Sequence, residues 1–273
     1  MKHFKNKYQI VATTIFIAYT LWWLLNQPHL KAQGTSVQLE ASSFAVLALY
    51  GSIVGFKVAR QWGGFKTVLG KALMFFSIGL LGQEIGQLIY DYMIYGLHQS
   101  ALQYPSIGDV AFFGSVLMYI AGAFYISKVA GVHRSLKDTR ARAIAIAVPV
   151  IILAVSGSIL IFQHSYDTSH PLTVFLDIAY PVGQAVYISL AIAAYLISRK
   201  TLGGVMRRAI LILIAALALQ YLADFTFIYQ SHHNTYVFGG YDDYFYLVSS
   251  FVMTTALIKF STVYNNLGSK SDG

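Results

Sequence analysis

Cysteine is missing from the whole sequence of 273 residues. Its absence excludes disulfide bonds and thiol catalysis, together with any zinc site that needs sulfur ligands. The Ser–His, HExxH and paired-aspartate signatures of proteases are missing too. We therefore expect a protein that is not an enzyme and that carries no cofactor and no metal.

Charged residues are scarce in this chain. They make up 11% of it, against about a quarter of a soluble domain, whereas 56% of the residues are hydrophobic and the mean hydropathy is +0.58. Such a chain cannot cover a water-facing surface, but it can face lipid, where a helix satisfies its own backbone amides. A helix needs an apolar run of about 20 residues to cross the hydrocarbon core. We predict an all-α polytopic membrane helix bundle with eight transmembrane helices, at about residues 9–25, 42–59, 68–95, 108–129, 141–163, 171–198, 207–230 and 241–262.

The basic residues are distributed unevenly across these spans. Eighteen of the 19 Lys and Arg residues fall on one side of the membrane, and only Lys31 falls on the other. Because basic loops stay in the cytoplasm, we predict a multi-pass protein of the cell membrane with both termini cytoplasmic. The net charge of +8 then indicates contacts between the cytoplasmic loops and anionic lipid head groups, and no nucleic acid partner.

The two ends of the chain need separate interpretations. The first apolar run follows basic residues, as in a signal peptide, but no clear small-residue cleavage site follows it. We interpret it as a retained anchor, with Trp22 and Trp23 at the outer interface. Residues 1–263 are predicted to form a single transmembrane domain, and residues 264–273 a disordered cytoplasmic tail.

Two stretches of the sequence resemble each other. GQLIYDY, a polar loop and IGDVAFFGSVLM in the first stretch match ADFTFIY, a polar loop and YDDYFYLVSSFVM in the second. This alignment pairs Gln87 with Asp224 and Asp109 with Asp243. It predicts a parallel 4+4 internal repeat, with halves at about 1–130 and 131–263 related by an axis along the membrane normal. The alternative is that apolar helices with aromatic outer ends look alike by chance.

Several polar residues lie inside the apolar runs, nearly all in the outer halves of their spans. A charged side chain there costs at least about 2.5 kcal/mol, and it usually faces the bundle interior or a wet cavity. We select ten candidate ligand-binding residues: Glu84, Gln87, Asp91, Asp109, Asp177, Tyr180, Gln184, Gln220, Asp224 and Asp243. Simpler roles compete with binding. Asp109 and Asp243 can cap the helices that they open, and Glu84 and Asp224 can hold two helices together by a buried hydrogen bond.

Other features of the outer half favour a cavity without proving one. Pro181 cannot donate to the carbonyl of Asp177, so a kink is expected there. Gly82 and Gly86 form a GxxxG motif that allows close approach of another helix. Numerous outer tyrosines fit either an interfacial belt or the wall of a pocket for a polar or cationic ligand. The outer histidines lack metal-ligand spacing, apart from the adjacent His232 and His233.

Three short motifs carry a resemblance to a known family. They are YPSIGD at 104–109, AYPVGQ at 179–184, and LAD at 222–224 followed by a polar loop, Tyr241 and Asp243. With them the chain, over roughly residues 42–262, resembles the membrane sensor region N-terminal to bacterial GGDEF and EAL cyclic-di-GMP enzymes and some histidine kinases. The resemblance implies a signal transduction role in a bacterial inner membrane. It also departs from the family pattern, because Gln87 and Gln184 stand where aspartate is usual.

These observations predict a non-catalytic, sensor-like membrane protein that binds a small ligand or cation in an outer polar and aromatic pocket. The sequence contains no GGDEF, EAL or kinase motif, so the signal is expected to pass to a separate cytoplasmic protein. The alternative is a transporter or channel for a proton, a cation or a small amine, which a repeat and a proline-broken helix would suit. Residues 207–219 have no polar side chain beyond the flanking arginines, which disfavours a polar route across the membrane.

Overall fold

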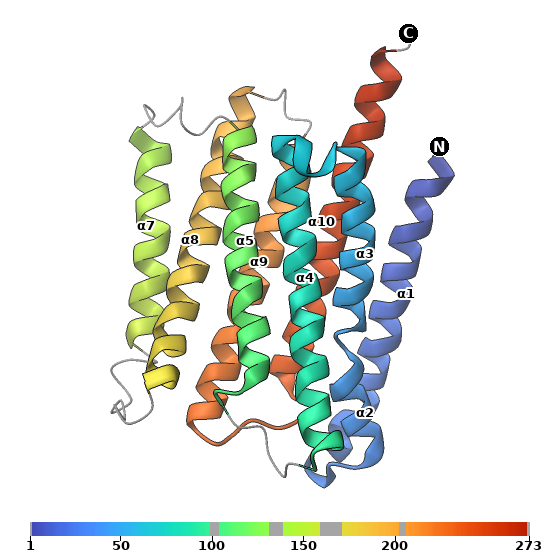
Figure 1. Cartoon of the computed structure of the whole chain (residues 1–273), viewed down its shortest axis with the longest axis vertical. Helices are drawn as coiled ribbons and strands as arrows, with labels where there is room; N and C mark the ends of the chain where they lie inside the picture. Colours follow the sequence, from blue (N-terminus) through green and yellow to red (C-terminus); the bar gives the residue numbers. More distant parts are fainter. Residues whose placement is uncertain (1, 99–103, 131–138, 159–170, 202–205, 272–273) are drawn as a thin grey trace.

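A computed structural model describes residues 2–98, 104–130, 139–158, 171–201 and 206–271. These residues form a bundle of long helices that run side by side (Figure 1), and no strand occurs among them. Seven helices of the described chain are long and apolar enough to cross a membrane. The predicted all-helical fold is therefore confirmed, and its composition is that of a multi-pass membrane protein.

The helices follow the predicted runs closely. They are α1 (Lys2–Asn26), α2 (Thr35–Ser43), α3 (Val46–Gln61), α4 (Val68–Asp91), α5 (Ile107–Val129), α7 (Thr139–Ser156), α8 (Pro171–Thr201), α9 (Arg207–His232) and α10 (Tyr241–Ser271), with short helical turns at Gln27–Ala32, Gly64–Lys66 and Tyr92–Gly96. Together α2 and α3 make one span. The predicted fifth span, 141–163, corresponds to α7, which has 18 residues; positions 159–163 lie outside the described residues.

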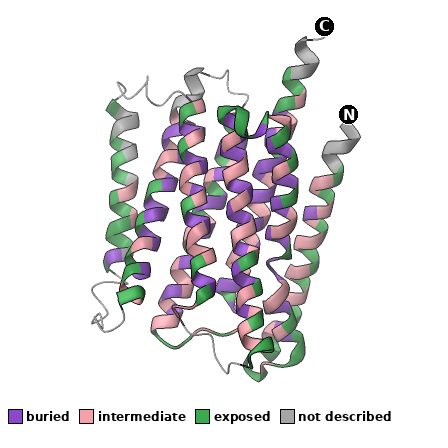
Figure 2. Cartoon of the chain, viewed as in Figure 1, coloured by how far each residue is buried: buried purple, intermediate pink, exposed green. Residues whose placement is uncertain are grey.

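Six helices form a closed ring in the bundle. Going round it, α3 packs on α4, α4 on α5, α5 on α8, α8 on α9, α9 on α10, and α10 returns to α3. The helices α1 and α7 lie outside the ring, α1 against α10 and α3, and α7 against α8 (Figure 1). Burial follows from this arrangement, because the ring helices turn their buried residues inward, while almost no residue of α1 is buried (Figure 2).

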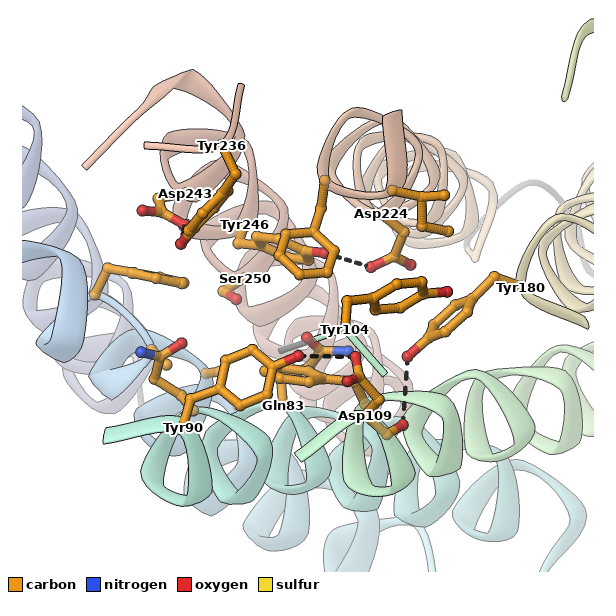
Figure 3. Close-up of a pocket in the computed structure, with 17 residues that line it drawn as sticks. Gln83, Tyr90, Tyr104, Asp109, Tyr180, Asp224, Tyr236, Asp243, Tyr246 and Ser250 are labelled. Atoms are coloured by element: carbon orange, nitrogen blue, oxygen red, sulfur yellow. Dashed lines mark hydrogen bonds between the residues drawn. The ribbon is translucent and has the colours of Figure 1, made fainter. Parts of the chain in front are cut away.

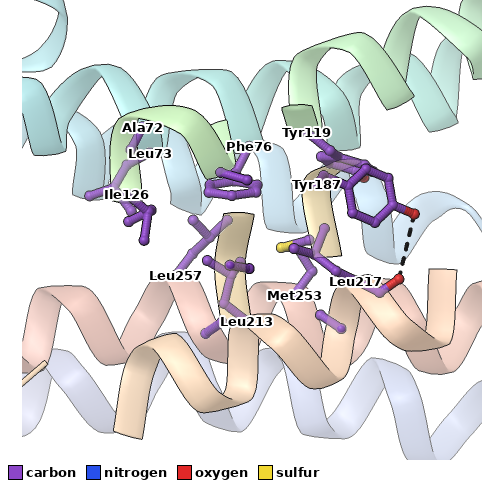
Figure 4. Close-up of a cluster of buried hydrophobic side chains, with 14 of the residues drawn as sticks. Ala72, Leu73, Phe76, Tyr119, Ile126, Tyr187, Leu213, Leu217, Met253 and Leu257 are labelled. Carbon is purple, nitrogen blue, oxygen red and sulfur yellow. Dashed lines mark hydrogen bonds between the residues drawn. The ribbon is translucent and has the colours of Figure 1, made fainter. Parts of the chain in front are cut away.

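The end of the ring at which α1 begins and α10 ends, here called the terminal end, has a dense apolar core. Phe76, Leu213, Leu217 and Leu257, from α4, α9 and α10, are each 0% exposed and interlock across the ring (Figure 4). Most of the polar groups of the interior lie at the opposite end. The interior of the ring is thus apolar toward the terminal end and polar toward the opposite end.

One boundary differs from the sequence prediction. Residues 264–273 were predicted to be a disordered tail, but α10 continues as a helix through Ser271. Tertiary contacts accompany the helix where this stretch begins, because Val263 is buried and the ring of Tyr264 packs edge-to-face on Trp62 with centroids 5.2 Å apart.

Glycines bring α4 close to α5. A Cβ added to Gly82 would lie 2.5 Å from Ser115 Oγ, and one added to Gly86 would lie 2.8 Å from the ring of Phe112. The GxxxG motif therefore faces α5 directly. The tightest site on the same interface is Gly79, where an added Cβ would lie 2.3 Å from the buried ring of Tyr119.

We expect Gly79→Ala to lower the free energy of unfolding by about 1–3 kcal/mol, because the extra methyl group overpacks the interface between α4 and α5. Gly114 of α5 supplies a matched control, since no atom lies within 4 Å of the Cβ that a substitution would add. Gly114→Ala is expected to be neutral or mildly stabilising through helix propensity. Thermal unfolding in detergent measures both. Equal effects of the two substitutions would contradict the close contact at Gly79.

Candidate functional site

A small cavity lies inside the ring at the end opposite the terminal end (Figure 3). Its volume is about 40 Å³, which is room for roughly three water molecules or one small ion. Helices α3, α4, α5, α8, α9 and α10 all contribute to its wall. The polar lining consists of three carboxylates, two amides, five tyrosines and a serine, namely Asp109, Asp224, Asp243, Gln83, Gln87, Tyr90, Tyr104, Tyr180, Tyr236, Tyr246 and Ser250.

Asp224 of α9 joins three helices. Its Oδ1 accepts hydrogen bonds from Gln220 Nε2 at 3.1 Å and from Tyr246 OH at 2.8 Å, and its Oδ2 accepts one from Gln184 Nε2 at 2.6 Å. Ser249 Oγ in turn donates to Gln220 Oε1 at 3.0 Å. The carboxylate is buried and holds α8, α9 and α10 in register, so the predicted interhelical hydrogen bond and a place in the cavity wall occur together.

Asp109 opens α5 and also lines the cavity. Its Oδ2 accepts from Ser106 N at 2.6 Å and from Ser106 Oγ at 3.1 Å, while Ser106 Oγ accepts from Gly108 N at 3.1 Å, so that the two residues form a capping box. Its Oδ1 accepts from Tyr90 OH at 2.8 Å. The predicted capping role is therefore present, and the same carboxylate still reaches the cavity.

Asp243 opens α10 in a comparable way. Its Oδ2 accepts from Gly239 N at 2.8 Å and its Oδ1 from Tyr236 OH at 3.3 Å. Gly239 has a positive φ of +74°, which suits glycine, and Trp23 Nε1 of α1 donates to its carbonyl oxygen at 2.9 Å. The turn that places Asp243 is thus held from outside the ring.

The charge of the cavity wall is unbalanced. Three carboxylates line it, and no Lys, Arg or His does so within the described part of the chain. Most of the remaining hydrogen-bonding capacity consists of acceptor lone pairs on carboxylate and phenol oxygens. A buried donor also remains: Gln83 Nε2 belongs to a side chain only 5% exposed and has no partner among the described residues. Such a wall suits a small cation with N–H donors that can also accept one hydrogen bond.

Three aromatic rings separate this cavity from a larger outer pocket. Tyr104, Phe227 and Tyr236 line both spaces, and the outer pocket has a volume of about 820 Å³. The ring centroid of Phe227 lies 6.0 Å from that of Tyr104 and 5.4 Å from that of Tyr236, both edge-to-face. These three rings, called here the aromatic partition, are the wall through which the cavity adjoins the outer pocket.

Hydrogen bonds to carboxylates hold two of the three rings. Tyr104 OH donates to Asp177 Oδ1 at 2.8 Å, and Asp177 Oδ2 lies 2.9 Å from His232 Nε2. Burial raises the pKa of Tyr104, and the negative charge of Asp177 raises it further, so the phenol stays protonated as a donor. Burial and Asp243 likewise raise the pKa of Tyr236.

The predicted binding residues separate into four groups. Gln87, Asp109, Tyr180, Asp224 and Asp243 line the cavity. Gln184 and Gln220 stand behind it and orient Asp224. Asp177 belongs to the outer hydrogen-bond chain at Tyr104, and Pro181 is buried inside α8 without lining the cavity.

Glu84 and Asp91 form the fourth group and do not line the cavity. They line a separate groove with Trp22 and Leu88, open on the outer face of α4, although Gln87 Nε2 donates to Asp91 Oδ1 at 3.1 Å. Glu84, Asp177 and Asp224 therefore do not share one cavity. The inward stripe of α4 is Gln83, Gln87 and Tyr90 at i, i+4 and i+7, and of the three α4 residues selected from the sequence only Gln87 belongs to it.

Sequence reasoning missed several cavity residues. Gln83, Tyr236 and Ser250 line the cavity, and Glu40 of α2 is buried beside the turn at Gly239 with one oxygen unpartnered in the described chain. Gln83 had a usable signal, because it precedes Gln87 by four residues just as Gln220 precedes Asp224. Glu40 was missed because it precedes the span predicted at 42–59.

Comparison with known proteins leaves the site to be interpreted from its own geometry. No protein-family model matches the chain. Neither the curated proteins nor the solved structures give a significant match.

Proposed function

We propose that this chain is a non-catalytic, sensor-like protein of the cell membrane that binds a small organic cation in the cavity and signals to a separate protein. The observation that supports this best is the cavity itself, where three carboxylates and aromatic rings surround a void that no basic side chain of the described chain lines. Ammonium groups are recognised by this combination of negative charge and aromatic faces. A ligand that fits must be small or must displace part of the aromatic partition.

The apolar core between the cavity and the terminal end favours binding over transport. A transporter needs a polar route to the terminal end. Phe76, Tyr119, Leu213 and Leu217 instead fill the ring there, with at most 1% of each side chain exposed (Figure 4). The only hydroxyl of this set, on Tyr119, belongs to a buried side chain. A cation would lose its hydration without compensation in this layer, which makes the cavity a dead end.

Helix packing supports the eight-span repeat. If α1, α3, α4 and α5 correspond to α7, α8, α9 and α10, the packing of α3 on α4 matches that of α8 on α9. The packing of α4 on α5 likewise matches that of α9 on α10, and the packing of α5 on α8 matches that of α10 on α3. An axis along the membrane normal, through the cavity, would relate the halves.

The sequence supports the same correspondence beyond the two pairs used to predict it. Residues of α2, α3 and α4 have similar residues 137 positions later, in α8 and α9. These pairs are Glu40 with Asp177, Tyr50 with Tyr187, and Gln83 with Gln220. In α5 and α10, Ser115 and Ser249 are 134 positions apart, as are Asp109 and Asp243. We infer an N-in, C-in protein of eight spans whose outer side contains the cavity.

The ring suggests how binding would be transmitted. Helix α10 carries Asp243, Tyr246 and Ser250 at the cavity and runs without interruption to Ser271 beyond the terminal end. A ligand that draws the carboxylates of α5, α9 and α10 together would shift the packing of α10 against its neighbours, and a partner at the terminal end would detect that shift.

The test is thermal unfolding of the protein in phosphatidylcholine nanodiscs. We would add ammonium, methylammonium, tetramethylammonium or ethanolammonium chloride, with sodium chloride at equal ionic strength as the control. At 100 times its Kd a ligand stabilises the folded state by about 2.7 kcal/mol, so a saturable rise in melting temperature is expected for at least one organic cation. Curves for all four that coincide with the sodium curve would count against the proposal.

Flux measurement separates the sensor from the alternative, a transporter or channel for a proton, a cation or a small amine. Proteoliposomes loaded with a pH indicator or with radiolabelled methylammonium are expected to show no protein-dependent flux. Flux above that of empty liposomes would favour transport instead, and the apolar core would then have to open.

A further inference from the structure

A second pocket lies at the terminal end, far from the cavity. It has a volume of about 340 Å³ and lies between α1, α3 and α10. Its lining is divided by chemistry. Val54, Val58 and Ile258 are buried and form an apolar floor, while Lys57, Gln61 and Ser261 supply the polar groups.

The polar groups of this pocket are arranged as donors. Ser261 Oγ donates to Gln61 Oε1 at 2.8 Å. This hydrogen bond occupies the amide oxygen, and the amide nitrogen of Gln61 has no hydrogen bond to a described protein atom. Lys57 Nζ lies 5.4 Å from the ring centroid of Tyr8, so its ammonium group stands over the pocket from the side of α3. An oxyanion placed between Lys57 and Gln61 would meet donors from both.

Among the described residues, no carboxylate forms an ion pair with Lys57. The eight described carboxylates are Glu40, Glu84, Asp91, Asp109, Asp177, Asp224, Asp242 and Asp243, and all belong to the half of the bundle away from the terminal end. At the terminal end the charged side chains of the described residues are basic, including Arg60 and Lys259, which adjoin the lining residues Gln61 and Ile258 in the sequence. The pocket therefore lies in a positive potential that attracts anions.

The surroundings of the pocket are apolar on the lipid side. Ile10 of α1, two residues after Tyr8, and Ile53 of α3, next to Val54, are 54% and 47% exposed. Hydrogen bonds from Tyr50 OH to Tyr8 O at 3.0 Å and from Gln9 Nε2 to Thr255 Oγ1 at 3.1 Å hold α1 to the ring at this level. A molecule with an anionic head and hydrocarbon chains could bind the donors through its head and pack its chains on the apolar residues.

We infer that the pocket between α1, α3 and α10 binds the phosphate of an anionic phospholipid, with Lys57 and Gln61 as its donors and the acyl chains along the exposed apolar residues. A free phosphate would leave the apolar floor and the exposed apolar residues without a partner. The site is independent of the cation proposed for the cavity. Its effect would be to fasten α1, which lies outside the ring, to α3 and α10.

The test compares phosphatidylglycerol with phosphatidylcholine of the same acyl chains, added to detergent-purified protein, with melting temperature as the readout. Phosphatidylglycerol is expected to raise the melting temperature more, and saturably. Lys57→Gln should weaken the apparent affinity about fivefold, the effect of one basic residue at a lipid surface, whereas Lys57→Arg should retain it. Lys66→Gln is the matched control, since Lys66 is exposed at the same end outside the pocket.

Three outcomes would overturn the inference. Equal weakening by Lys66→Gln would assign the effect to diffuse charge. A comparable shift with inorganic phosphate would identify a free-anion site. An unaltered response of Lys57→Gln would exclude the pocket. None of these outcomes bears on the response to organic cations, which is measured in phosphatidylcholine alone.

Discussion

Asp224→Asn is expected to abolish the rise in melting temperature that organic cations produce. The substitution removes one of the three carboxyl groups from the wall of a cavity that no basic residue of the described chain lines. It also replaces an acceptor by a donor. Two donors converge on Oδ1, from Gln220 and Tyr246, so the asparagine oxygen would take that place. Its amide nitrogen would then face Gln184 Nε2, which lies 2.6 Å from Oδ2 in the native protein.

Two separable effects follow from this geometry. The donor conflict should lower the free energy of unfolding by about 1–3 kcal/mol without any ligand, the usual cost of a buried polar group left unsatisfied. The response to cations should vanish because the charge is lost. Both are read from melting curves in phosphatidylcholine nanodiscs, with ethanolammonium and methylammonium chloride as probes and sodium chloride as the reference.

Asp91→Asn is the matched control for this experiment. Asp91 is also a carboxylate of the outer half, but it lines the groove beside Trp22 and not the cavity. Its variant should keep the full response to cations. A response that disappears equally in both variants would point to the summed surface charge as the cause. A response that survives in Asp224→Asn would remove the cavity as the binding site.

The helices and most polar anchors could be predicted from the sequence because simple rules govern them. Length and apolar composition locate the spans, and the cost of a buried carboxylate identifies Asp109, Asp224 and Asp243 as residues that must face inward. The repeat in the sequence already paired Asp109 with Asp243. These inferences need only the spacing of apolar residues and the free energy of transferring a side chain from water to lipid, and one sequence is enough to apply both.

The face of α4 that points into the ring could not be predicted in the same way. Gln83 and Glu84 are adjacent, and either could begin an inward stripe with period 3.6. Charge favoured Glu84, but packing decided for Gln83, because Gly82 and Gly86 turn toward α5 and fix the rotation of the helix. Likewise Tyr104 and Tyr241 each precede an aspartate near the start of a helix. Tyr104 nevertheless lines the cavity, whereas Tyr241 is 48% exposed.

Phe227→Ala is expected to open the cavity to the outer pocket, and the absence of cysteine makes this measurable. Ser250→Cys places a single thiol on the cavity wall, behind the aromatic partition. In the otherwise native protein a small methanethiosulfonate should react with it slowly. Phe227 makes two edge-to-face contacts, each contributing about 0.5–1.5 kcal/mol, so its removal should speed labelling by roughly 10–100-fold.

Two controls make this labelling experiment decisive. Ser231→Cys lies in the outer pocket, outside the partition, and should react quickly with or without Phe227. Phe225→Ala removes a ring from the same helix that lines neither pocket, so it should leave the labelling of Ser250→Cys slow. If Ser250→Cys reacts as fast as Ser231→Cys in the native background, the partition does not close the cavity.

The charge of the reagent tests the character of the cavity in the same samples. With Phe227→Ala in place, methanethiosulfonate-ethylammonium should label Ser250→Cys on the order of tenfold faster than the anionic ethylsulfonate, because a cleft lined by carboxylates concentrates cations. Adding Asp224→Asn should reduce that ratio. At Ser231→Cys, where Lys31 and His232 line the same pocket, the two reagents should differ much less. A ratio near one at Ser250→Cys would mean that the three carboxylates do not present negative charge to the void, and a cationic ligand would then have no reason to bind there.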